Sequence, residues 1–152
     1  MIEPDYENLD ILLENMNVDM NNFNISVLPF ALGEKNQKKK FYYNIDYCSQ
    51  FSSISNKYIR VKKLDDLNVK PTFIKIHTEG NENNIIKGGL KTIKKYRPII
   101  VTTWKKKKKG LWKLPLYLIN NLNEYIFYFR LHSWYGTGAV IYSIPKERML
   151  KW

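Results

Sequence analysis

An imidazole and a carboxylate stand close together at residues 77–80, where the sequence reads His-Thr-Glu-Gly. The residues before this stretch, 72–77, have the apolar composition of a strand, and those after it carry the apolar spacing of an amphipathic helix. In sheets with parallel strands, ligands bind in the crevice outside the carboxyl ends of the strands. We therefore predict a functional site at this junction. His77 is a candidate proton acceptor there, because histidine exchanges protons near neutral pH.

The length and composition indicate one domain, residues 1–152, with a single core. A chain of 152 residues suits one domain, and its 44% of hydrophobic residues can form the core. The one cysteine, Cys48, excludes an internal disulfide, and two histidines are too few for a zinc framework. We expect no metal site and a reduced, cytoplasmic setting. The first ten residues lack a secretion signal, and no apolar run is long enough to cross a bilayer.

The formal net charge of +11 suggests an anionic partner, since Lys and Arg neutralise phosphates. Five lysines at 105–109, between Trp104 and Trp112, have the composition of a module that binds single-stranded nucleic acid or a partner chain. The alternative is a solvated lysine surface, which a charge run usually is. We favour the solvated surface and do not expect nucleic acid as the partner.

Helices and strands alternate along the chain. Leu9, Leu12, Leu13 and Met16 predict an amphipathic helix that Asp5 caps. Further helices are predicted at 83–96 and 111–122, with a short helical turn at 64–67. Strands are predicted from 24 to about Pro29, with a turn at Gly33, and at 39–45, 57–64, 72–77 and 97–104, and a polar loop at 46–56. Residues 124–134 and 138–144 predict a hairpin. This order indicates a Rossmann-like α/β sheet, mostly parallel, with a C-terminal antiparallel hairpin.

Several stretches in this order resemble the FkbM family of S-adenosylmethionine-dependent methyltransferases. They are "IEPDYENLDILLENM", "VLPFALG", "SSISN" before "VKKLDDL", "FIKIHTEGNENNIIKGGLKTIKKYRPIIVTTW" and "LHSW" with "AVIY". The resemblance covers essentially the whole chain. It implies transfer of a methyl group from S-adenosylmethionine to a hydroxyl of a small molecule or glycan, such as a sugar or a polyketide-like acceptor.

The resemblance also assigns site residues. Glu3 matches the acidic residue that binds the cofactor ribose, and a carboxylate can accept hydrogen bonds from both ribose hydroxyls. The alternative is a solvated residue at a frayed terminus. Glu79 and Gly80 match the family motif Asp-x-Glu-Gly, but His77 replaces its aspartate. The histidine either retains the proton-accepting role or marks a site that has decayed.

Two other segments match the family less specifically. His132 falls near the active-site side of the last strands, where it is either a second base or substrate contact, or an aromatic side chain packed beside its neighbours. Ser52 and Ser53 match a Ser-Ser element that lies close to the cofactor in the family. Two hydroxyls in a polar loop carry little weight by themselves.

The family pattern begins with a strand and a glycine-rich turn that hold the cofactor, and this sequence starts after both. We therefore expect an N-terminally truncated domain that lacks the first strand and helix. The strand at 72–77 would then lack one neighbour and expose unpaired backbone groups. Cofactor affinity should fall, and a partner chain could supply the strand.

Overall fold

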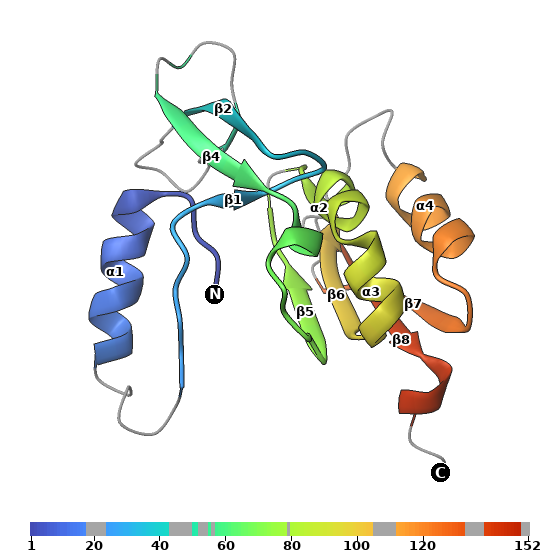
Figure 1. Cartoon of the computed structure of the whole chain (residues 1–152). Helices are drawn as coiled ribbons and strands as arrows, with labels where there is room; N and C mark the ends of the chain where they lie inside the picture. The colour runs from blue at the N-terminus through green and yellow to red at the C-terminus, as the bar shows by residue number, and fades with distance from the viewer. Residues whose placement is uncertain are drawn as a thin grey trace.

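The computed structural model describes residues 1–17, 24–42, 50–51, 55, 57–78, 80–104, 112–132 and 139–149. Ser52, Ser53, Glu79 and the lysines at 105–109 lie outside these ranges. The described residues form a mixed α/β structure with two four-stranded sheets, ordered β1-β4-β2-β3 and β5-β6-β8-β7 (Figure 1). None of the helices in the described ranges combines the length and the apolar character needed to cross a membrane.

The second sheet contains the predicted strand–helix junction. Strand β5 pairs in parallel with β6, β6 pairs antiparallel with β8, and β8 pairs antiparallel with β7. A parallel pair needs a crossover connection, which here contains two helices, whereas the hairpin joins antiparallel neighbours directly. The strands are β5 (Phe73–Ile76), β6 (Ile99–Trp104), β7 (Tyr125–Leu131) and β8 (Ala139–Pro145).

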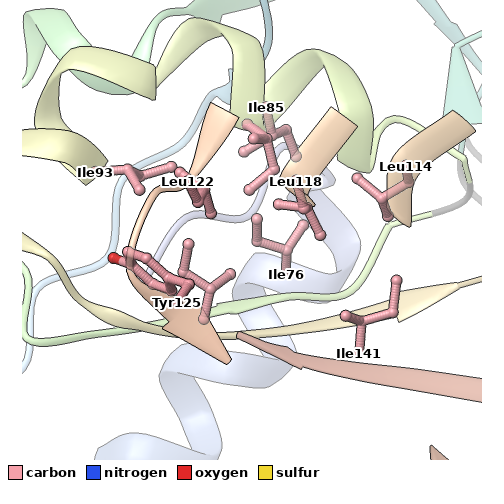
Figure 2. Packing of buried hydrophobic residues seen from close by; sticks show 10 residues of the cluster. Ile76, Ile85, Ile93, Leu114, Leu118, Leu122, Tyr125 and Ile141 are labelled. Carbon is pink, nitrogen blue, oxygen red and sulfur yellow. The ribbon is translucent and has the colours of Figure 1, made fainter. Parts of the chain in front are cut away.

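Three helices cover one face of this sheet, and Figure 2 shows the core between them and the strands. Ile86, Ile93 and Leu118 from the helices are fully buried. They pack with Ile100 and Ile141 of the central strands. Full burial of one such side chain stabilises the fold by roughly 1.5–3 kcal/mol. The helices are α2 (Glu82–Gly88), α3 (Leu90–Tyr96) and α4 (Lys113–Asn121).

The first sheet has a smaller core, with Phe41, Ile59 and Val61 buried and the Phe51 ring meeting Phe41 edge-on. Strand β4 is central, parallel to β1 and antiparallel to β2. Strand β3 lies inside the segment expected to be a polar loop. The strands are β1 (Ala31–Leu32), β2 (Gln37–Tyr42), β3 (Gln50–Phe51) and β4 (Tyr58–Lys62).

The N-terminal helix α1 (Tyr6–Asn17) confirms the predicted amphipathic helix. Asp5 caps it as expected, because its Oδ1 accepts the Glu7 N–H at 3.0 Å. Its apolar stripe is poorly covered, however, and Ile11 and Leu13 are exposed. In Figure 1, α1 stands apart from the group formed by α2, α3 and α4.

The expectation of a Rossmann-like, mostly parallel sheet is not confirmed. Of the six pairings between strands in the described residues, β1–β4 and β5–β6 are parallel and the other four are antiparallel. The reason is connectivity, since only a crossover permits a parallel pair. The C-terminal antiparallel hairpin is confirmed.

The single helix predicted at 83–96 is wrong, because the structure divides it into α2 and α3 at Gly88 and Gly89. Backbone from the end of β1 fills the space beside this break. A Cβ at Gly88 would overlap the Gly33 carbonyl oxygen, and one at Gly89 would meet the Leu64 side chain. Asp65, in the predicted helical turn (Leu64–Asp66), accepts the Thr92 N–H at 2.8 Å and so caps α3.

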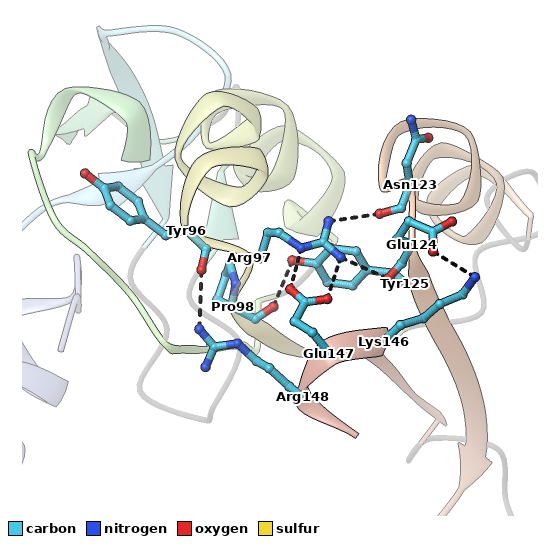
Figure 3. Close-up of polar contacts among 9 residues, drawn as sticks. All are labelled: Tyr96, Arg97, Pro98, Asn123, Glu124, Tyr125, Lys146, Glu147 and Arg148. Carbon is cyan, nitrogen blue, oxygen red and sulfur yellow. Dashed lines mark hydrogen bonds and ion pairs between the residues drawn. The ribbon is translucent and has the colours of Figure 1, made fainter. Parts of the chain in front are cut away.

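A polar cluster joins the end of α3 to the C-terminal residues (Figure 3). Arg97 donates from Nε and Nη2 to the two carboxylate oxygens of Glu147, at 2.5 and 2.8 Å. Its Nη1 and Nη2 also donate to the carbonyl oxygens of Asn123 and Glu124. The Tyr125 hydroxyl donates to the Pro98 carbonyl oxygen at 3.0 Å, and burial raises the pKa of Tyr125 to about 12.

Candidate functional site

The turn after β5 is organised by Glu82, a buried carboxylate in the first turn of α2. Its Oε1 accepts the Thr78 hydroxyl at 3.0 Å and the Gly80 N–H at 3.3 Å. Gly80 has a φ of 93°, a conformation that glycine adopts without steric penalty. Glu82 therefore fixes the path of the chain between His77 and the helix, although Glu79 itself is outside the described residues.

A pocket of about 100 Å³ lies between this turn and the first sheet. We call it the Asn81 pocket. Asn81 donates from Nδ2 to the Leu32 carbonyl oxygen at 2.8 Å, and Asn84 donates from its own Nδ2 to Asn81 Oδ1 at 2.9 Å. The bond to Leu32 ties the start of α2 to the end of β1, and the bond from Asn84 holds the Asn81 side chain in place. The lining residues are Gly33, Glu34, Lys35, Gln37, Lys39, Phe51, Val61, Asn81 and Asn84.

The lining of the Asn81 pocket combines an aromatic ring with cations and amides. Lys39 Nζ lies 4.1 Å from the centroid of the Phe51 ring, a cation–π arrangement. Glu34 is held by Lys87 of α2, with 3.6 Å between the charged atoms. Such a surface offers hydrogen-bond donors and acceptors beside an apolar platform, which suits a polar organic ligand.

Residues next in sequence to two of the predicted site segments line this pocket. Phe51 immediately precedes Ser52 and Ser53, and Asn81 follows directly after Glu79 and Gly80. The structure therefore brings the neighbours of both segments together, while Ser52, Ser53 and Glu79 lie outside the described ranges. The sequence reasoning missed Asn81 and Asn84, whose spacing of three residues on one helix was the available signal.

Glu3 lies just before the start of α1, beside the segment that leads into β1. Ile2 forms an isolated parallel bridge with Leu28, and the Glu3 N–H donates to the Leu28 carbonyl oxygen at 3.2 Å. Glu3 Oε1 accepts the Asp5 N–H at 2.9 Å. Burial raises the pKa of Glu3, and the hydrogen bond from Asp5 opposes that rise. Glu3 is thus a fixed, half-buried carboxylate and not a frayed, solvated residue.

An open cleft of about 400 Å³ adjoins the first turn of α1. Tyr6, Glu7, Lys57 and Tyr58 line it. Its aromatic and charged lining lies within a few residues of Glu3 along the chain.

His77 and His132 lie at the same end of the second sheet but on its two edge strands. His77 follows β5 and is exposed, and His132 follows β7. Two strands separate β5 from β7, so three strand spacings of 4.7–4.9 Å place the backbones of these two strands roughly 14 Å apart. His132 Nε2 is 3.0 Å from the Tyr142 hydroxyl, with the two rings edge-on. The two histidines do not form one catalytic pair.

The chain has a mixed α/β fold with polar side chains at the carboxyl end of the parallel pair β5–β6, the place where ligands bind in parallel α/β sheets. The Methyltransferase FkbM domain family matches residues 1–129, so the chain belongs to this family. No match was found among curated proteins.

A crystal structure of methyltransferase FkbM from Methylobacillus flagellatus KT shares the fold, with a TM-score of 0.75 and 24% sequence identity. The similarity covers 94% of this chain and 35% of that one. The chain thus spans about a third of the length of the solved relative.

Proposed function

We propose that the chain is an FkbM-type, S-adenosylmethionine-dependent O-methyltransferase domain whose site includes Glu3 and the turn after β5. The acceptor is a hydroxyl of a small molecule or glycan. The family match over residues 1–129 is the observation that carries the proposal. The position of His77 and Glu82 at the carboxyl end of β5 supports it, because ligands of such sheets bind there.

The residues present fit part of the cofactor. Glu3 would hold the ribose, since a fixed carboxylate with acceptor capacity beyond the Asp5 N–H can take two hydroxyl donors. The chemistry that S-adenosylmethionine supplies when bound is a methyl group already activated on a sulfonium. We assign no described residue to the methionine end of the cofactor.

The chain's own tasks are then to position the acceptor hydroxyl and to receive its proton. His77 is the candidate base, because it is exposed at the carboxyl end of β5 and carries no hydrogen bond within the described residues. His132, which follows the far edge strand β7 and contacts the hydroxyl of Tyr142 on β8, is assigned an acceptor contact. The Asn81 pocket, with its amides and aromatic ring, would bind the polar body of the acceptor.

We also propose that this chain alone binds the cofactor weakly. Strand β5 is an edge strand, so the sheet ends directly beside the proposed transfer site. A site with one side open leaves its ligand partly hydrated and its residues less firmly positioned. The lysines at 105–109 lie outside the described residues, and no observation favours a nucleic-acid-binding function.

Equilibrium dialysis of the purified chain with labelled S-adenosylmethionine tests both parts of this proposal. We expect a dissociation constant well above 100 μM, which corresponds to a binding free energy on the order of −5 kcal/mol or weaker. Glu3→Gln should weaken binding several-fold further, whereas Glu14→Gln, the same charge change on an exposed residue of α1, should not. Micromolar binding would contradict the proposed impairment, and an unchanged constant in Glu3→Gln would remove Glu3 from the cofactor site.

A further inference from the structure

Helix α4 carries a second apolar face, on its solvent side. Trp112, Leu116 and Ile119 are 64%, 52% and 48% exposed. Successive residues of a helix are about 100° apart, so these three fall within a stripe about 60° wide. Leu114 and Leu118 turn toward the core instead. A helix that only covers a sheet needs one apolar face, so the exposed stripe calls for another explanation.

The stripe lies on the flank of α4 that faces away from α2. On the α2 side, Lys87 Nζ is 5.9 Å from the centroid of the Tyr117 ring. Tyr117 is about 130° around the helix from the middle of the stripe. In Figure 1, α4 is the last helix of its row and stands on the β7 side, and β7 is an edge strand of the sheet. The stripe therefore lies above the margin of the sheet.

The end of β7 adds two exposed apolar side chains on the helix-covered face. Phe129 and Leu131 are 52% and 65% exposed. They lie opposite Ile141 and Ala139 of β8, and Ile141 belongs to the core under the helices. Figure 2 shows Leu114, from the start of α4, at the Ile141 end of this core. The start of α4 and the end of β7 thus lie at the same end of the sheet. The α4–β7 patch consists of Trp112, Leu116, Ile119, Phe129 and Leu131.

The elements that form the α4–β7 patch carry cations and no carboxylate. Lys113 and Arg130 are exposed, and neither forms an ion pair within the described residues. Residues 83–146 of the sequence contain thirteen Lys and Arg and one carboxylate, Glu124. Glu124 pairs with Lys146, 2.9 Å away. A partner that covers the patch must therefore supply negative charge as well as an apolar layer.

We propose that the α4–β7 patch binds the surface of an anionic lipid bilayer. The apolar side chains insert at the boundary between headgroups and acyl chains, and Lys113 and Arg130 contact the headgroups. Tryptophan prefers this boundary, and Leu, Ile and Phe gain from burial in it. Nucleic acid fits the patch less well, because bases stack on aromatic rings and not on Leu or Ile. The inference concerns a surface other than the Asn81 pocket and does not rest on methyl transfer.

A second copy of the chain is a poorer occupant than a lipid surface. Each copy has a net charge of +11. A symmetric contact through the patch would place the Lys113 and Arg130 side chains of two such copies close together, and like charges repel. An anionic bilayer offers the opposite charge over an area that is not limited by the shape of a partner.

Co-sedimentation of the chain with lipid vesicles tests the proposal. One set of vesicles is phosphatidylcholine alone, and the other is an equimolar mixture of phosphatidylcholine and phosphatidylglycerol. We expect at least about tenfold tighter binding to the mixed vesicles, weakened by added NaCl. Phosphatidylcholine brominated on its acyl chains, added to the mixed vesicles, should quench tryptophan fluorescence. Trp112→Phe should remove most of this quenching.

Two double variants separate the patch from apolar surface elsewhere. Leu116→Gln with Ile119→Gln should weaken binding to the mixed vesicles at least about tenfold, at an unchanged melting temperature. Ile11→Gln with Leu13→Gln changes exposed residues of α1 and should bind as the wild type does.

Charge is tested in the same way. Lys113→Gln should weaken binding about fivefold, whereas Lys38→Gln, an exposed change on β2, should not. The proposal is overturned by absent or equal binding to the two kinds of vesicle, by an unchanged affinity in the α4 double variant, or by quenching that persists in Trp112→Phe. A lipid-free dimer that the α4 double variant dissociates would also overturn it, because the patch would then belong to a second copy.

Discussion

The side-chain amide of Asn81 donates a hydrogen bond of 2.8 Å to the carbonyl oxygen of Leu32. This contact joins Asn81, the residue directly before α2, to the end of β1. It therefore links a helix that covers the second sheet to the first sheet. It also forms one wall of the Asn81 pocket. The Asn81 side chain thus connects the start of α2 to the first sheet, beside the ion pair between Lys87 and Glu34.

Asn81→Ala should lower the free energy of unfolding by about 1 kcal/mol, because the Leu32 carbonyl loses its donor. Asn81→Asp should lower it further, by about 2 kcal/mol, since a carboxylate then faces a carbonyl oxygen. Urea unfolding followed by circular dichroism measures both. Asn84→Ala is the control, because within the described residues the Asn84 side chain bonds to Asn81 and not to the first sheet. Its effect should be about half a kcal/mol. Equal effects for all three variants would mean that the bond to Leu32 is not what holds the sheets together.

Gly88→Ala should destabilise the fold even though alanine is the better helix former. In a free helix the substitution would gain about 1 kcal/mol. Here the new methyl group would overlap the Gly33 carbonyl oxygen, which is backbone and cannot move aside easily. We expect a net loss of about 1–3 kcal/mol in the free energy of unfolding.

Gly89→Ala is the matched control for Gly88→Ala. The methyl group at Gly89 would meet Cδ2 of Leu64, at 2.6 Å, and this is the end of a flexible side chain. The loss in the free energy of unfolding should therefore be smaller for Gly89→Ala than for Gly88→Ala, as measured by thermal unfolding. A stabilising effect of Gly88→Ala would show that α2 does not approach Gly33 as closely as described.

The sequence was sufficient to predict the elements whose pattern is local. The helix capped by Asp5, the strand at 72–77, the helical turn at Leu64–Asp66 and the C-terminal hairpin are all present. The apolar spacing at 83–96 also correctly predicted helix. It could not predict the break at Gly88 and Gly89, because the break follows from Gly33 and Leu64, which come from distant segments.

The candidate site was predictable only in outline. The pattern of the sequence identified the end of β5, but the carboxylate that organises the turn is Glu82, five residues beyond His77. Lys75 is a charged residue within the predicted strand at 72–77, and the structure places it on an exposed position of β5, an edge strand among the described residues. The link between Asn81 and Leu32 joins residues 49 positions apart and has no local signal.

Ser143→Ala should raise the stability of the protein. Ser143 is fully buried in β8, and its hydroxyl has no hydrogen-bond partner in the described structure. Removing a buried, unpaired hydroxyl relieves a desolvation penalty, so the free energy of unfolding should rise by about 1 kcal/mol. Thermal unfolding by calorimetry measures the change.

Thr102→Val provides the comparison for Ser143→Ala. Thr102 is equally buried on the neighbouring strand, but its hydroxyl donates to the Thr103 carbonyl oxygen at 3.1 Å. Its removal should lower the free energy of unfolding by about 1 kcal/mol. If both substitutions change the free energy of unfolding in the same direction, the presence of a hydrogen-bond partner for a buried hydroxyl does not control stability in this core.

The pair formed by Arg97 and Glu147 predicts a loss of stability in acid (Figure 3). The hydrogen bonds from Arg97 lower the pKa of Glu147 from 4.5 to about 2. A carboxylate whose pKa is depressed on folding stabilises the folded state above its unfolded pKa, and this contribution disappears as the pH falls through the folded pKa. The contribution of the pair should therefore be complete above pH 4.5 and be lost progressively down to about pH 2.

Glu147→Gln isolates this contribution from those of the other carboxyl groups. The variant keeps the shape of the side chain but has no charge to lose, so the difference in melting temperature between wild type and variant reports the pair alone. We expect that difference to be largest near neutral pH and to approach zero near pH 2. Glu124→Gln serves as the control, because Glu124 is exposed and pairs only with Lys146 in the described residues, and its difference should stay small throughout. A difference for Glu147→Gln that does not change with pH would exclude an ionised pair with Arg97.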